Sequence, residues 1–248
     1  MILPLADENL RQYWAHARSS SLEHHQFLKQ MADLATALSY LHNDLVTQDS
    51  KPLAGFHMDL KPENILVEFD SSSCLYRLRI SDFGSSKIRP KESSQKLPPH
   101  PGLGTYEPPE CQMELPISQA YDIWSLGCIY LECTAWLIKG SGAIDAFAED
   151  RLNDVEIAGN VFKDDYFFTL EFDEFSNPIQ AITRPAVIKW VRDLQGDPEC
   201  SDGIAQLLLV ISNGLLQVER SKRIKAEWLH QRLELLHTSK MPMEFYSK

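Results

Sequence analysis

The sequence has fewer basic than acidic residues, and its cysteines lack the spacing of C-x-x-C motifs and zinc sites. Its 248 residues include 24 Lys and Arg against 35 Asp and Glu, which gives a formal net charge of -11. Such a charge repels phosphate backbones and anionic lipid headgroups on average, so neither nucleic acid nor a membrane is expected as a partner. The five cysteines form no C-x-x-C pair and have no spacing with histidine that suits zinc. They are therefore expected to be reduced thiols.

Long apolar runs are missing as well. The most apolar stretch, 123–138, is interrupted by Glu132 and falls short of the roughly 20 residues that a membrane-spanning helix needs. A buried core helix is the better interpretation. The N-terminus lacks a basic region and a long apolar core, so no signal peptide is expected and the protein is predicted to be intracellular, cytoplasmic or nuclear.

Periodicity predicts a mainly helical chain with one small β-hairpin. Apolar residues recur at spacings of three and four within 24–42, which indicates an amphipathic helix. Two β-prone runs, 65–69 and 75–80, are separated by a serine-rich turn. Residues 85–104 lack periodicity and predict a surface loop. Two further helices are predicted over 204–216 and 225–236.

An acidic segment lies between Asp145 and Glu174, where ten acidic residues stand against only Arg151 and Lys163. A run of like charges is usually a solvated face, and this is the favoured interpretation. Docking of a basic substrate or partner is the alternative.

Two motifs that flank the predicted hairpin carry the strongest chemical signal. Residues 57–64 read His-Met-Asp-Leu-Lys-Pro-Glu-Asn, and residues 82–84 read Asp-Phe-Gly. Together they supply a carboxylate that can accept a proton, a lysine for phosphate charge and oxygen ligands for a hard cation. A P-P-E run at 108–110, a D-x-W-S-x-G run at 122–127 and Arg223 follow in the chain.

These five motifs, in this order, resemble those of the eukaryotic protein kinase family, serine/threonine type. The resemblance covers nearly the whole chain. It implies the mainly helical C-terminal lobe of the kinase α+β fold, with a hinge stub at 1–10, the lobe at 11–238 and a tail at 239–248. The catalytic loop would be 57–64 and the activation segment 82–110. The implied function is magnesium-assisted transfer of the γ-phosphate of ATP to serine or threonine of protein substrates.

The resemblance also implies roles for the reacting residues. Asp59 would accept the proton of the substrate hydroxyl, Lys61 would steady the transferring phosphate, and Thr105 would bond to both. Asn64 and Asp82 would hold Mg²⁺, for which oxygen ligands are suitable.

The nucleotide would lie against four other residues. Backbone groups of Pro4 and Ala6 would bond to adenine, although Pro4 can offer only its carbonyl. Asn9 would reach the ribose, and Leu66 would form the floor beneath adenine.

Six residues are expected to hold the site rather than to react, namely His57, Phe83, Gly84, Glu110, Asp122 and Arg223. His57 is expected to pack behind the site, with its backbone tied to Asp122. Glu110 and Arg223 are expected to form a buried ion pair.

Two departures from the family pattern qualify these expectations. Met58 replaces the arginine that pairs with a phosphorylated activation loop in many kinases, so loop phosphorylation is not expected to be a strong on-switch. The 56 residues before His57 contain no visible glycine-rich loop, strand lysine or helix glutamate. The small lobe is therefore expected to be absent, and the apolar surface that would meet it invites a partner.

Other interpretations stay open. One is a non-catalytic pseudokinase or scaffold, which would use the lobe only for binding. Another is a fragment of a longer kinase, whose glycine-rich loop and strand lysine would be encoded upstream of Met1. A small-molecule phosphotransferase of kinase-like fold is less favoured because of the runs at 108–110 and 122–127.

Overall fold

The computed structural model describes residues 6–16, 23–70, 75–93, 97–99, 104–154, 164–175 and 177–238. The helices are α1 (Leu10–His16), α2 (His24–Asn43), α3 (Pro109–Gln112), α4 (Ala120–Lys139), α5 (Gly142–Asn153), α6 (Pro185–Gln195), α7 (Asp202–Val210) and α8 (Ala226–His237). The strands are β1 (Glu8–Asn9), β2 (Leu53–Phe56), β3 (Ile65–Asp70), β4 (Leu75–Ile80), β5 (Lys87–Pro90), β6 (Phe168–Phe172) and β7 (Pro178–Thr183). Short 3-10 turns are η2 (Pro62–Asn64), η3 (Phe83–Ser85) and η5 (Arg220–Lys222), and a π-helical turn, η4 (Ile211–Leu215), follows α7.

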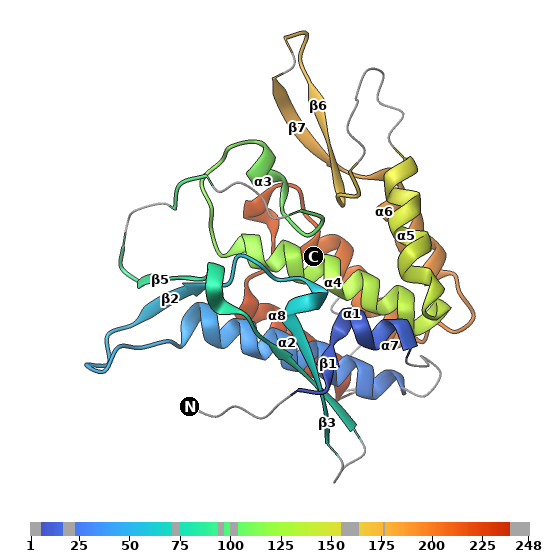
Figure 1. The fold of residues 1–248 in the computed structure, drawn as a ribbon, viewed down its shortest axis with the longest axis horizontal. Helices are drawn as coiled ribbons and strands as arrows, with labels where there is room; N and C mark the ends of the chain where they lie inside the picture. The colour runs from blue at the N-terminus through green and yellow to red at the C-terminus, as the bar shows by residue number, and fades with distance from the viewer. Residues whose placement is uncertain are drawn as a thin grey trace.

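Helix α4 runs through the middle of the helical body and packs against α5, α6 and α7 (Figure 1). Its residues from Tyr121 to Leu137 are all buried. A helix that is apolar on nearly every side is stable only inside a core. The buried helix predicted over 123–138 is thus confirmed. A Cβ atom at Gly127 would lie 2.7 Å from Leu215 Cβ, so glycine permits the close approach of η4 to this helix.

The other predicted helices are also present. Helix α2 buries an apolar face that includes Leu28, Met31, Leu34 and Leu38, and it packs along α8. The run at 204–216 forms α7 and η4. Among the residues that the structure describes, no helix is both long and apolar enough to cross a bilayer.

The predicted hairpin is the β3–β4 pair, which β1 extends into a three-stranded antiparallel sheet. Asn9 lies opposite Leu66 in this sheet, and Asp7 donates its backbone N–H to the Val67 carbonyl at 3.2 Å. The N-terminal segment is therefore joined directly to the strand that follows the catalytic-loop motif.

The expectation of only one hairpin was wrong. Strand β5 lies within the range predicted as a surface loop and pairs with β2. Strands β6 and β7 pair with each other in a third sheet. Most β5 side chains are exposed, so this strand is held by backbone hydrogen bonds and leaves little periodic signal in the sequence. The β6–β7 hairpin projects from the helical body (Figure 1).

Part of the acidic segment is used inside the fold, and residues 155–163 lie outside the described ranges. Asp164 pairs at 2.5 Å with the buried guanidinium of Arg184, and Asp150 accepts a hydrogen bond from the Trp190 indole at 2.7 Å. Asp154 accepts the Ala186 N–H at 2.5 Å in the first turn of α6. Asp150 and Asp154 thus connect α5 to α6, and Asp164 binds the residue that precedes α6, so a purely solvated face does not describe the segment.

Candidate active site

The catalytic-loop motif is anchored by the buried carboxylate of Asp122, in the first turn of α4. One oxygen accepts the His57 N–H at 2.9 Å and the other accepts the Met58 N–H at 2.8 Å. His42 Nε2 lies 2.9 Å from the first oxygen. The predicted contact between the His57 backbone and Asp122 is confirmed. Met58 has a φ of 67°, a left-handed conformation that costs a non-glycine residue about 1–3 kcal/mol unless its surroundings impose it.

Asp122→Ala is expected to destabilise the protein by at least about 3 kcal/mol, because each buried N–H left without an acceptor costs about 1–3 kcal/mol. Urea unfolding would measure the loss. Asp145→Ala is the matched control, since Asp145 is also an aspartate in a first helical turn but is exposed. The control should stay within about 0.5 kcal/mol of the parent. Equal losses for the two variants would contradict the anchoring role.

Three of the predicted reacting residues lie together on the other side of this loop. Lys61 Nζ donates to the Asp59 carboxylate oxygens at 3.0 and 2.8 Å. Asn64 Nδ2 donates to the Asp59 carbonyl at 2.8 Å and to its carboxylate at 3.0 Å. The Asp59 side chain is only 12% exposed. Its carboxylate is thus held by two donors from the turn that follows it, in a fixed orientation.

His57 has a hydrogen-bond partner for each ring nitrogen. Nδ1 accepts the Asp59 N–H at 3.3 Å, and Nε2 lies 2.9 Å from the Ser81 carbonyl. Because Nδ1 accepts, the ring proton belongs on Nε2, which donates it to Ser81. The ring also packs edge-on against Phe83 at 5.1 Å between centroids. The His57 ring is therefore buried, with both of its nitrogens bonded to protein groups.

Asn64 is hydrogen-bonded to Ser81, the residue that precedes Asp82. The Asn64 carbonyl accepts the Ser81 N–H at 2.9 Å and the Ser81 hydroxyl at 3.0 Å. Asp82 has a φ of 58°, and one carboxylate oxygen accepts the Gly84 N–H at 3.2 Å. Within the described part of the chain its other oxygen accepts no hydrogen bond, and the residue is exposed.

These two side chains fit a magnesium ion. Asn64 uses its amide nitrogen toward Asp59, which leaves its side-chain oxygen for a ligand. Magnesium prefers oxygen ligands, and it commonly takes one or two from the protein and the rest from phosphates and water. The described residues hold no group of three or more His, Cys, Asp or Glu side chains suited to a metal. Asn64 and Asp82 would thus need the oxygens of a bound phosphate to complete the coordination.

The structure describes three of the four residues that were predicted to lie against the nucleotide. Pro4 lies outside the described residues, whereas Ala6 and Leu66 are both half-buried. Asn9 caps α1, since its side chain accepts the Gln12 N–H at 3.0 Å and its own N–H reaches the Gln12 side chain at 3.0 Å. This capping box was readable as N-x-x-Q in the sequence but was missed. It leaves only the Asn9 side-chain NH₂ for the predicted ribose contact.

Thr105 does not take the position that was predicted for it. Its hydroxyl donates to Asp165 at 2.6 Å, so its single proton is not available to Asp59. The next residue, Tyr106, instead lines a small recess together with Asp59 and Lys61. The Thr105 contact with Asp165 depends on residues 60 positions apart, which no local pattern predicts.

Tyr106 belongs to a buried polar network that sequence reasoning missed. Its hydroxyl donates to Glu132 at 2.6 Å and accepts from Arg11 Nη2 at 2.7 Å. Arg151 Nη2 contacts Glu132 at 3.1 Å. Burial raises the pKa of Glu132, while Arg151 and Tyr106 act to lower it. In the sequence, Glu132 was only an interruption in an apolar run.

The predicted ion pair between Glu110 and Arg223 is present and fully buried. Two parallel hydrogen bonds join the guanidinium to the carboxylate at 2.8 and 2.7 Å. Arg223 also donates to the carbonyls of Gln217 at 2.7 Å and Ala120 at 2.9 Å. The pair therefore fastens the end of the P-P-E run to the C-terminal part of the fold.

Comparison with protein families matches residues 1–232 to the protein kinase domain. The chain belongs to the protein kinase family. It is 31% identical over 132 residues to homeodomain-interacting protein kinase 4 of Homo sapiens. The aligned residues cover 53% of this chain and 20% of that protein. It is 35% identical over 107 residues to 3-phosphoinositide-dependent protein kinase 1 of Homo sapiens. That alignment covers 43% of this chain and 17% of the relative.

A probable receptor-like protein kinase of Arabidopsis thaliana is 39% identical over 100 residues, which covers 40% of this chain and 20% of that protein. The chain thus spans a fifth or less of the length of these three kinases.

Met58, where the kinase pattern has an arginine, is buried in a small apolar cluster. Its neighbours there include Phe56, Cys111, Ile117 and Tyr121, with Leu97 packed against them. Leu97 also forms a β-bridge with Ile117. Leu97 of the predicted activation segment thus packs against an apolar cluster at the position where the kinase pattern has an arginine.

Proposed function

We propose that this chain catalyses transfer of the γ-phosphate of ATP to serine or threonine hydroxyls of protein substrates. The observation that carries the proposal is the cluster in which Lys61 and Asn64 hold the Asp59 carboxylate, with the Asn64 carbonyl bonded to Ser81, the neighbour of Asp82. Phosphoryl transfer needs a proton acceptor, positive charge and metal ligands in fixed positions more than it needs covalent chemistry from the protein. Each of these is available in the cluster.

In the proposed reaction, Asp59 takes the proton from the attacking hydroxyl. Lys61 forms an ion pair with the same carboxylate and would place a positive charge beside the transferring phosphate. Asn64 and Asp82 would hold magnesium, which neutralises charge on the phosphates when it is bound. Leu66, Ala6 and Asn9 are proposed to face the nucleotide.

We propose further that a small, β-rich lobe covers the phosphates and raises nucleotide affinity and rate above what this chain provides alone. A groove between α2 and β4 supports it, because its lining includes Tyr40, Leu41, Leu78, Ile80 and Phe83. Phe83 is 53% exposed, which is unusual for a large apolar side chain beside a buried histidine. We propose that this surface receives the small lobe, either from a longer form of the same polypeptide or from a partner protein.

Calorimetric titration of the purified chain with MgATP tests the proposal, together with a phosphate-transfer assay on a mixed serine- and threonine-containing protein substrate. MgATP is expected to bind, and Asp82→Asn is expected to remove the magnesium dependence of binding. Asp193→Asn, an exposed aspartate on α6, is the control and should bind as the parent does. A folded parent that neither binds MgATP nor transfers phosphate would overturn the catalytic proposal and favour a scaffold.

A further inference from the structure

Arg11 joins two segments that lie far from it in the sequence. Its Nε donates to Glu63 at 3.2 Å, and its Nη2 donates to the Tyr106 hydroxyl at 2.7 Å. Glu63 lies in η2, the turn between Lys61 and Asn64. Tyr106 follows Thr105 at the end of the activation segment. One guanidinium therefore contacts both segments that border Asp59.

We propose that Arg11 is a positioning residue that keeps the catalytic loop and the end of the activation segment in register, and so shapes the side of the site where the substrate hydroxyl enters. The proposal rests on the proposed kinase function. Arg11 itself touches none of the reacting groups named above.

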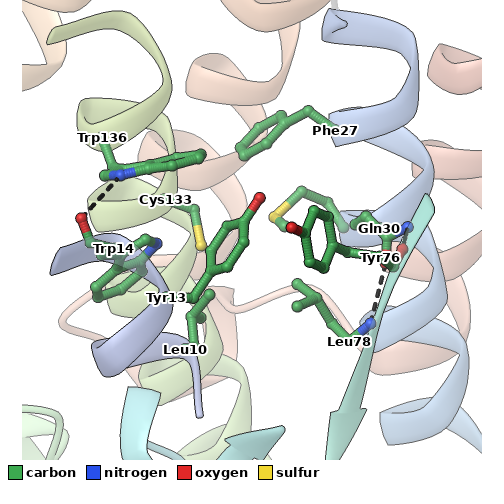
Figure 2. Close-up of a pocket in the computed structure, with 10 residues that line it drawn as sticks. Leu10, Tyr13, Trp14, Phe27, Gln30, Tyr76, Leu78, Cys133 and Trp136 are labelled. Carbon is green, nitrogen blue, oxygen red and sulfur yellow. Dashed lines mark hydrogen bonds between the residues drawn. The ribbon is translucent and has the colours of Figure 1, made fainter. Parts of the chain in front are cut away.

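The helix that carries Arg11 provides a rigid base for this contact. Leu10, Tyr13 and Trp14 of this helix are buried and line the pocket between α4 and the hairpin that Figure 2 shows, and the Arg11 guanidinium lies 5.6 Å from the centre of the Trp14 ring. Trp136 of α4 donates its indole N–H to the Trp14 carbonyl at 3.2 Å. The capping box between Asn9 and Gln12 fixes the start of the helix. The backbone of Arg11 is thus fixed, and its side chain extends from there to Glu63 and Tyr106.

Tyr106, which accepts the hydrogen bond from Arg11, is also fixed in place. The Tyr106 hydroxyl donates to Glu132, which is 1% exposed in the central helix α4. Arg151 binds the same carboxylate. Because this chain of hydrogen bonds ends on a buried helix, any movement of Tyr106 away from Arg11 would also disturb Glu132.

The side chain chemistry explains why arginine is used. The guanidinium is planar and offers several N–H donors in a fixed fork, so it can bind Glu63 and Tyr106 at the same time. A lysine ammonium is a point charge on a flexible stem and would hold only one of them. The ion pair is also half-exposed, with side-chain exposures of 40% and 43%, and exposed pairs contribute little to global stability. Its loss should therefore change local order more than overall folding.

Hydrogen–deuterium exchange on the full chain tests this inference without needing nucleotide or turnover. Arg11→Ala is expected to speed amide exchange about tenfold within both 61–64 and 104–107, which corresponds to the loss of about one hydrogen bond. The thermal midpoint should barely move. Arg11→Lys is expected to restore protection in one of these segments only. Arg192→Ala, at an exposed arginine in the last turn of α6, is the control and should change neither.

Chemical rescue separates positioning from a merely structural role. Millimolar guanidinium chloride should restore protection in Arg11→Ala, whereas sodium chloride at the same ionic strength should not. In a turnover assay, the same variant should raise the KM for protein substrate and lower kcat without changing the KM for ATP.

Unchanged exchange in both segments, or a uniform increase throughout α1, would overturn the inference even if the chain transfers phosphate. Conversely, the expected exchange pattern without any phosphate transfer would leave the positioning role standing and remove the proposed kinase activity.

Discussion

Replacing Asp59 by asparagine is expected to slow the proposed phosphate transfer by about a hundred- to ten-thousand-fold, the usual contribution of a positioned general base. Asparagine has nearly the same shape as aspartate and can still accept hydrogen bonds from Lys61 and Asn64 through its carbonyl oxygen. It cannot take up the proton of an attacking hydroxyl. Initial rates at saturating MgATP and protein substrate would measure the effect.

Two controls make this result specific to the chemical step. MgATP affinity and the urea midpoint of Asp59→Asn should match those of the parent, because the local hydrogen bonds are kept. Asp193→Asn changes an exposed aspartate on α6 in the same way and should retain the parent rate. An undiminished rate for Asp59→Asn would show that the proton goes elsewhere.

Removing either side chain of the Glu110–Arg223 pair is expected to cost about 3–5 kcal/mol of unfolding free energy, because the remaining charge is buried without its partner. The two side chains are 2% and 0% exposed, so water cannot replace the lost contact. Arg223→Ala also strips a donor from the Gln217 and Ala120 carbonyls. Urea denaturation of Glu110→Ala and Arg223→Ala at neutral pH would measure both losses.

A nearby ion pair supplies the matched control for this prediction. Glu219 and Lys222 are 2.8 Å apart but are 56% and 65% exposed. Glu219→Ala should therefore leave the free energy of unfolding essentially unchanged. The double variant Glu110→Met/Arg223→Leu should recover part of the loss, since apolar side chains leave no unpaired charge. Small losses for both single variants would mean that water enters the site.

The parts of the fold that could be predicted are those with a local signature. The spacing of apolar residues marked α2 and the run that became α4, and the serine-rich turn between two β-prone runs marked the β3–β4 hairpin. Likewise, the contacts of Asp122 with His57 and of Glu110 with Arg223 followed from the resemblance of spaced motifs.

Strand β5 shows why other parts of the fold were missed. Its side chains are mostly exposed and it is held by backbone pairing with β2, so no apolar alternation marks it. The Asn9–Gln12 cap did have a sequence signal, but the nucleotide interpretation of Asn9 obscured it.

The sequence by itself determined the family, the order of the motifs and the candidate base, phosphate-binding and metal-binding side chains. Only the tertiary structure decided that Thr105 turns to Asp165, that Tyr106 lies beside Asp59, and that Arg11 reaches both neighbouring segments. The hydrogen bonds of Thr105 and Arg11 join residues more than fifty positions apart. Such pairings depend on how separate helices and loops pack around α4, and side-chain hydrogen bonds leave no periodic trace along the chain.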